Sequence, residues 1–196
     1  MMPMDRVRGA ELGGYVVAAA GAGALVAFGL FSTYGQPFGT LNDIFLLVMT
    51  LAIAPIMLGC YELGGVTPLW PARFSLAAGI GAVLVWSLAQ VLMVTGVVTF
   101  VDEQPATGAF AVEAAALIGI GAWLIGAPLL AGPWLPGPLR WLGALSGLGF
   151  VAFGLGLLGG GVNDPLTYVG GIGYQILFPV WAFLFARLLG TRRRQA

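Results

Sequence analysis

Long apolar runs divide the chain into six segments, separated by short connections that contain charged and turn-forming residues. The runs cover approximately residues 11–32, 41–61, 74–97, 108–130, 140–160 and 166–188. A helix of about 20 apolar residues spans a bilayer, whereas a barrel strand would alternate polar and apolar positions over about ten residues. The pattern therefore predicts an all-α integral membrane protein with six transmembrane helices.

The connections between the runs are short and contain glycine, proline and acidic residues, which are typical of tight turns. Those after the first, third and fifth runs carry the acidic residues Asp43, Asp102, Glu103 and Asp164, and no basic residue. No connection is long enough to act as a linker between domains. We therefore expect three helical hairpins in a single polytopic membrane domain over residues 1–196.

All basic residues of the chain are arginines, and they fall on one side of the six-run pattern. They are Arg6, Arg8, Arg73, Arg140, Arg187, Arg192, Arg193 and Arg194. Basic residues next to transmembrane helices remain preferentially in the cytoplasm, so both termini are predicted to be cytoplasmic. The complete absence of lysine, with abundant Ala, Gly and Leu, favours the plasma (inner) membrane of a prokaryote as the location.

Composition excludes several classes of protein. Hydrophobic residues make up 59% of the chain and charged residues 8%, against about 25% charged residues in soluble domains. The chain has no histidine and one cysteine, Cys60, which excludes histidine-ligated metals, a Ser-His-Asp triad and an intramolecular disulfide. We expect no metal and no cofactor. The terminal arginines are typical of a topology anchor, so nucleic acid is not an expected partner.

Glycines are frequent inside the runs, with 32 in the chain and helical spacings such as Gly143 to Gly147 and Gly156 to Gly160. Small residues allow helix backbones to approach closely in lipid, where the hydrophobic effect does not drive helices together. The spacing predicts tight packing of the fifth helix against its neighbours.

Glu113 is the most informative polar residue, because it lies some five residues inside the fourth run, on the side with no basic residue. Ionisable groups within a membrane are expensive and often mark a functional site. Glu113 must therefore reach interfacial water, carry a proton, or accept hydrogen bonds from neighbouring helices.

Other polar residues occur at comparable or somewhat greater depth in the third and sixth runs. The candidate ligand-binding set is Glu113, Gln90, Ser87, Tyr168, Tyr174 and Gln175, with Trp86 one turn deeper than Gln90. Together these side chains would line a pocket that is open to the outside. The alternative is that Glu113 reaches the head groups and that the two glutamines are interhelical packing contacts.

Acidic residues on the arginine side have a simpler interpretation. Glu11 and Glu62 lie near the expected membrane boundary, as do Arg73 and Arg140. We expect ion pairs among them at the interface.

Three functions remain open, all with the lipid bilayer as a partner. The leading hypothesis is a protein that binds or transports a small neutral or lipophilic molecule. The alternative is an accessory or structural subunit of a larger membrane complex, or a homo-oligomer. An intramembrane enzyme acting on a lipid or isoprenoid, with Glu113 as proton donor, ranks last because the chain has no phosphate loop, metal-ligand spacing or paired deep carboxylates.

Overall fold

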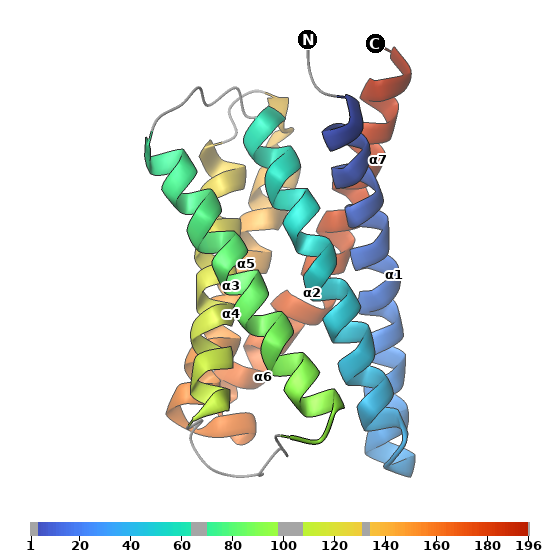
Figure 1. Ribbon diagram of the computed structural model, residues 1–196, viewed down its shortest axis with the longest axis vertical. Helices are drawn as coiled ribbons and strands as arrows, with labels where there is room; N and C mark the ends of the chain where they lie inside the picture. The colour runs from blue at the N-terminus through green and yellow to red at the C-terminus, as the bar shows by residue number, and fades with distance from the viewer. Residues whose placement is uncertain (1–3, 64–69, 98–107, 131–133, 196) are drawn as a thin grey trace.

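A computed structural model describes residues 4–63, 70–97, 108–130 and 134–195 of the protein, and the described residues are organised as helices (Figure 1). The first five long helices are α1 (Met4–Tyr34), α2 (Phe38–Leu63), α3 (Trp70–Val94), α4 (Ala109–Leu130) and α5 (Gly137–Gly159). A short 3-10 turn, η2 (Gly161–Asn163), precedes the last part of the chain. There, α6 (Pro165–Ile172) passes through a π-helical segment, η3 (Gly173–Leu177), into α7 (Phe178–Gln195).

Six helical stretches are long and apolar enough to cross a membrane, the last of them running from Pro165 to Gln195 through η3. The predicted all-α class with six long apolar helices is confirmed. Some helices end at a different residue from the apolar run, because a capping motif stops the helix first. α3 ends at Val94, short of residue 97, because Gly96 adopts a left-handed φ of 71°. The amides of Gly96 and Val97 then bond back to the carbonyls of Met93 and Leu92, both at 3.0 Å, which is the Schellman arrangement.

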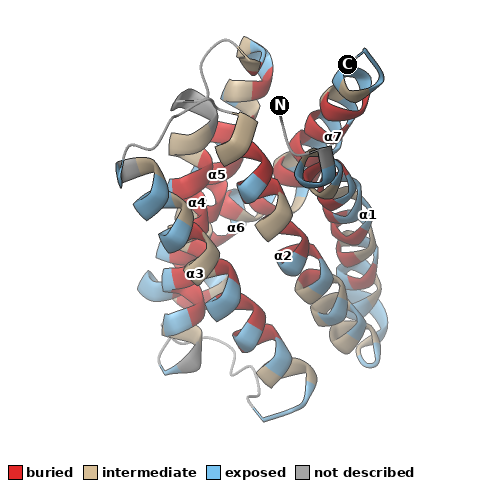
Figure 2. Ribbon diagram, turned by 45° about the horizontal axis from the view of Figure 1, so that its top comes forward, coloured by how far each residue is buried: buried red, intermediate tan, exposed pale blue. Residues whose placement is uncertain are grey.

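The long helices form a ring in chain order. The expected hairpin partners pack together: α1 with α2, α3 with α4, and α5 with both α6 and α7. Neighbouring hairpins also pack, through α2 with α3 and α4 with α5, and α7 closes the ring against α1 (Figures 1 and 2). Side chains on the inner faces of the helices are the buried ones (Figure 2).

Aromatic side chains fill much of the interior of this ring. The fully or almost fully buried members are Trp86, Phe150, Tyr174, Phe178, Trp181 and Phe185. The centroids of neighbouring rings are 5.2 to 5.9 Å apart, and the pairs are either edge-to-face or stacked. Contacts of this kind add to the stabilisation from burial alone. We refer to this set as the aromatic column.

Helix α5 approaches its neighbours at glycines, as the sequence predicts. A Cβ atom on Gly147 would lie 2.6 Å from the carbonyl oxygen of Gly121 on α4. A Cβ on Gly149 would collide with the backbone of Gly173 in η3. The absence of side chains at these positions therefore lets the backbones of α4, α5 and η3 come into direct contact.

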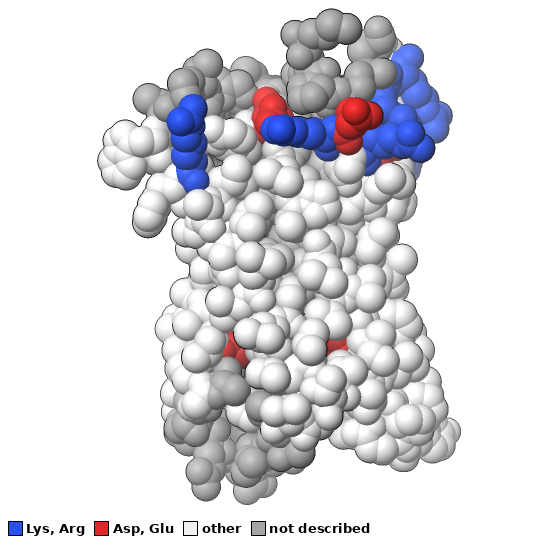
Figure 3. Space-filling model, in the orientation of Figure 1, with Lys and Arg blue, Asp and Glu red and all other residues white. Residues whose placement is uncertain are grey.

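The two ends of the bundle differ in charge. The helix termini that carry the arginines, the starts of α1, α3 and α5 and the end of α7, lie at one end, which we call the arginine end (Figures 1 and 3). The other end holds the turn between α1 and α2 and the starts of α4 and α6, and we call it the arginine-free end. Acidic side chains there reach the visible surface only as small areas among uncharged atoms (Figure 3).

Candidate functional site

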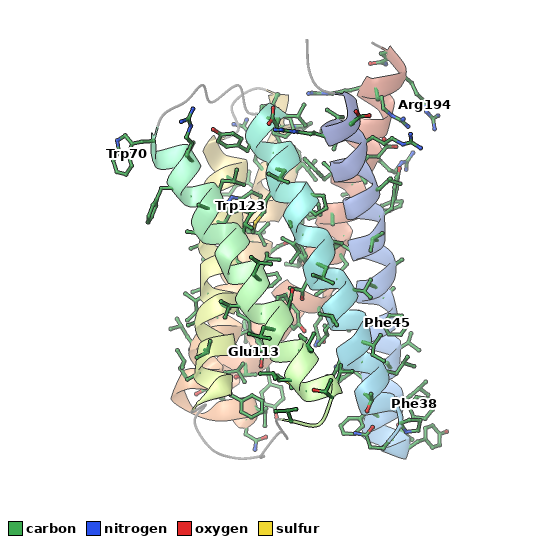
Figure 4. All side chains as sticks on the ribbon, viewed as in Figure 1. Phe38, Phe45, Trp70, Glu113, Trp123 and Arg194 are labelled. Carbon is green, nitrogen blue, oxygen red and sulfur yellow. The ribbon has the colours of Figure 1, made fainter. Side chains whose placement is uncertain are left out.

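Glu113 lies in the second turn of α4 at the arginine-free end, on the same half of the bundle as Phe38 and away from Trp70 and Arg194 (Figure 4). Its side chain is only 7% exposed. The carboxylate oxygen Oε1 accepts hydrogen bonds from Trp86 Nε1 at 3.0 Å and from Gln90 Nε2 at 2.9 Å. Both donors come from α3, four residues apart and therefore on one helix face. The carboxylate thus turns into the bundle and is held by neutral donors.

Asn42 and Asp43 on α2 extend this group of polar side chains. Asp43 is half-buried, accepts a hydrogen bond from Asn42 Nδ2 at 3.4 Å, and lies close enough to Glu113 to interact with it electrostatically. Each of these residues, like Gln90, lies about one helical turn from the arginine-free end of its helix. We call Asn42, Asp43, Gln90 and Glu113 the acceptor cluster.

Two oxygens of the acceptor cluster are buried without a partner. Gln90 Oε1 and Asn42 Oδ1 have no hydrogen-bond partner among the described residues, and Gln90 is only 2% exposed. Because Gln90 Nε2 binds Glu113, the Oε1 atom on the same amide carbon lies beside that carboxylate. A buried, unsatisfied acceptor costs about 1–3 kcal/mol. The cluster therefore has unused capacity to receive hydrogen-bond donors.

No basic side chain compensates the charge of the cluster. All arginines of the chain lie at the other end, and the chain has no lysine or histidine. The N-termini of α2 and α4 point toward the arginine-free end, and their partial positive charge favours nearby carboxylates. That effect falls off within the first turn, while Asp43 is the sixth residue of α2 and Glu113 the fifth of α4. Compensation by the helix dipoles is therefore only partial.

Tyr174 connects the acceptor cluster to the aromatic column. Its ring lies 5.8 Å from Trp86, 5.2 Å from Phe150 and 5.0 Å from Phe153, measured between ring centroids, and the residue is 2% exposed. Tyr174 also lies within electrostatic range of Glu113. It belongs to the π-helical segment η3, and such segments occur frequently at functional sites.

The remaining candidates from the sequence lie outside this arrangement. Ser87 is buried, but its hydroxyl donates to the carbonyl of Val83 in its own helix at 2.8 Å. Tyr168 is 64% exposed and donates to Asn163 Oδ1 at 3.3 Å. Gln175 is half-buried and interacts with the Tyr174 hydroxyl. The structure therefore brings Glu113, Gln90 and Tyr174 together and leaves Ser87 and Tyr168 apart from them.

Sequence reasoning missed two participants, Asn42 and Asp43, and named Trp86 only as a neighbour of Gln90 and not as a hydrogen-bond donor to Glu113. The first two were assigned to an outer connection, but α2 already begins at Phe38 and includes both. Trp86 precedes Gln90 by four residues, so helical spacing alone would have paired the two as donors. Asn42 and Asp43 lie about as far from the start of α2 as Gln90 lies from the end of α3 and Glu113 from the start of α4. This shared depth was the signal in the sequence that could have identified them.

The acids at the arginine end have ionic partners. Arg6 pairs with Glu62 between α1 and α2, and Arg193 Nε lies 3.1 Å from Glu11 Oε2 between α7 and α1. Ion pairs therefore form at this end as the sequence predicts. Their basic members are Arg6 and Arg193 rather than Arg73 or Arg140, because α1 lies between α2 and α7.

Metal binding has little support in the described ranges. No group of three or more His, Cys, Asp and Glu side chains within residues 4–63, 70–97, 108–130 and 134–195 is placed to hold a metal ion. The acceptor cluster supplies two carboxylates and two amides.

Searches of protein-family models, of curated proteins and of solved structures gave no match to this chain. The class of protein is therefore defined by its own features. Six candidate membrane spans, ringed around an aromatic column, are the architecture of a multi-pass helical membrane protein.

Proposed function

We propose that the protein binds or transports a small lipophilic molecule, with Glu113 and Gln90 as the polar part of its binding site. The observation that carries the proposal is the unpaired acceptor Gln90 Oε1, buried beside a carboxylate that no basic residue neutralises. Ionisable groups inside membrane spans are costly, and they commonly mark a substrate or ion pathway. Side-chain packing alone would not require a carboxylate at this position.

The apolar surroundings support a lipophilic ligand. Trp86 donates to Glu113 and packs against Tyr174 as part of the aromatic column, whose rings are well suited to contact an apolar body. Few polar groups within a mainly apolar lining are the usual composition of a small-molecule site.

The proposal is tested by binding measurements on the purified protein in nanodiscs of zwitterionic lipid. The probes are four molecules with the same octyl chain: octylammonium, octyltrimethylammonium, octanamide and octanoate. We expect at least one probe to bind the wild type about tenfold more tightly than the Glu113→Gln variant, a difference of about 1.4 kcal/mol. Glutamine keeps the side-chain length and a carbonyl oxygen for the donors of Trp86 and Gln90.

Asp164→Asn provides the matched control for this experiment. Asp164 is also an acid at the arginine-free end, but it caps α6 by accepting a hydrogen bond from the amide of Leu166 at 2.8 Å. Asparagine is an equally good cap, so binding should not change. Equal binding of every probe to wild type and Glu113→Gln would contradict the proposal and favour an accessory subunit. Copurification of a partner subunit in mild detergent would also favour an accessory subunit.

The orientation in the membrane is part of the same proposal: the arginine end faces the cytoplasm of a prokaryotic cell. The test uses two single-cysteine variants in a Cys60→Ala background, which removes the native thiol. One variant has cysteine in place of Tyr34, which is 70% exposed at the arginine-free end, and the other has cysteine in place of Thr191, which is exposed at the arginine end. A membrane-impermeant maleimide added to intact cells should label position 34 and spare position 191. Labelling of position 191 alone would reverse the orientation.

A further inference from the structure

We infer that the molecule bound at the acceptor cluster is a lipophilic amine, held through its protonated ammonium group. This inference rests on the proposed binding function and specifies the chemical class of the ligand. It combines the charge of the cluster, its unpaired hydrogen-bonding atoms and the apolar neighbours.

The charge argument comes first. Asp43 and Glu113 lie within electrostatic range of each other, and the chain places no basic side chain at their end of the bundle. Two carboxylates that interact electrostatically, with no basic side chain at their end of the bundle, favour a cation. An anionic ligand would be repelled by both carboxylates, with only the partial positive charge of the helix N-termini to offset the repulsion. A neutral ligand would leave the carboxylates without a counter-charge.

The hydrogen-bonding atoms then specify the kind of cation. Gln90 Oε1 and Asn42 Oδ1 are buried acceptors without partners among the described residues, and they belong to the two amides that donate to Glu113 and Asp43. A primary ammonium group carries three N–H donors and no acceptor, which complements amide and carboxylate oxygens. A quaternary ammonium has the same charge but no N–H group, so it would leave Gln90 Oε1 unsatisfied.

The position of the cluster suits an amphipathic cation. Asp43 is half-buried whereas Glu113 is 7% exposed, so the cluster extends inward from a partly accessible acid. The cluster lies about one turn from the arginine-free end, the depth at which the polar head of a lipophilic molecule enters the apolar region. The indole of Trp86 adjoins the cluster through its hydrogen bond to Glu113, and Tyr174 packs against Trp86, so the apolar part of the ligand would meet aromatic rings.

Comparison of probes within the octyl series tests this inference. At neutral pH we expect octylammonium to bind the wild type at least about tenfold more tightly than octanamide or octyltrimethylammonium, since each lacks either the charge or the N–H donors. Glu113→Gln should remove this preference, and Asp43→Asn should reduce it by a smaller factor because Asp43 is more exposed. Asp164→Asn should keep it in full. Titration with sodium chloride alone should produce no Glu113-dependent binding signal.

The outcomes separate the inference from the function on which it rests. Octanamide binding that is as tight as octylammonium binding, and equally dependent on Glu113, would overturn the amine and retain the binding function. Binding of octyltrimethylammonium as tight as that of octylammonium would overturn the role of the N–H donors. Glu113-dependent sodium binding would replace the amine with an inorganic cation. Loss of Glu113 dependence for every probe would overturn the proposed function itself.

Discussion

The two ends of the bundle hold acidic side chains in opposite ways. At the arginine end, Glu62 and Glu11 face the guanidinium groups of Arg6 and Arg193. At the arginine-free end, Glu113 faces the neutral N–H groups of Trp86 and Gln90. The arginine side chains of these pairs are 58% and 35% exposed, whereas Trp86 and Gln90 are 1% and 2% exposed. The partners of the acids are thus partly exposed cations at one end and buried neutral donors at the other.

This difference indicates what each group of acids does. An ion pair near water contributes up to about 1 kcal/mol and mainly joins α1 to its neighbours. A buried carboxylate bonded only by neutral donors is costly, and the structure gains little stability from keeping it. The acids at the arginine end therefore have a structural explanation, whereas Glu113 has no ionic partner, and this difference is the basis of the proposed binding site.

The largest expected effect comes from removing the aromatic donor at the arginine-free end. Trp86→Ala deletes a side chain that is 1% exposed, together with the hydrogen bond to Glu113. We expect it to lower the free energy of unfolding by about 3–5 kcal/mol, seen as a large drop in the melting temperature in detergent.

Trp86→Phe separates packing from hydrogen bonding in this prediction. Phenylalanine preserves most of the contact with Phe150 and Tyr174 but has no N–H group for Glu113. Its cost should be about 1–3 kcal/mol. A Trp86→Ala variant no less stable than wild type would show that the aromatic column does not support this end.

A basic residue introduced at the arginine-free end should make the two ends alike. Gln90→Lys places an ammonium group beside Glu113 and removes the unpaired Oε1 atom. Octylammonium binding should weaken by at least about tenfold, or about 1.4 kcal/mol, because the site then carries its own cation. Gln90→Leu serves as a control without charge and should weaken binding less. Unchanged binding in Gln90→Lys would place the probe elsewhere.

The smallest effect is expected at the arginine end. Arg6→Ala removes the partner of Glu62, in a pair whose side chains are 58% and 25% exposed. The free energy of unfolding should fall by less than about 1 kcal/mol, and high salt should reduce the difference from wild type further. A loss of unfolding free energy as large as that of Trp86→Ala would contradict the prediction, because this end would then depend on its ion pair as strongly as the other end depends on Trp86.

Much of the fold followed from local features of the chain, whereas the site followed only in part. The six helices appear where the apolar runs predict them, since length and hydropathy act on each segment separately. Glu113 and Gln90 were identified because polar residues are rare in such segments. Asp43 was missed as a member of the site because it was assigned to the outer connection after the first run, whereas it lies in the second turn of helix α2. Tyr168 was included although it points outward.

By itself, the sequence determined the number of helices, their approximate limits and the one-sided distribution of arginine, because each depends on composition along the chain. Only the tertiary structure decided which side chains meet. These helices are apolar nearly all round, so no stripe marks the face that turns inward. Close contacts at glycines, such as Gly79 against Trp123 and Gly119 against Ala82, set how α3 approaches α4. That approach brings Trp86 and Gln90 onto Glu113.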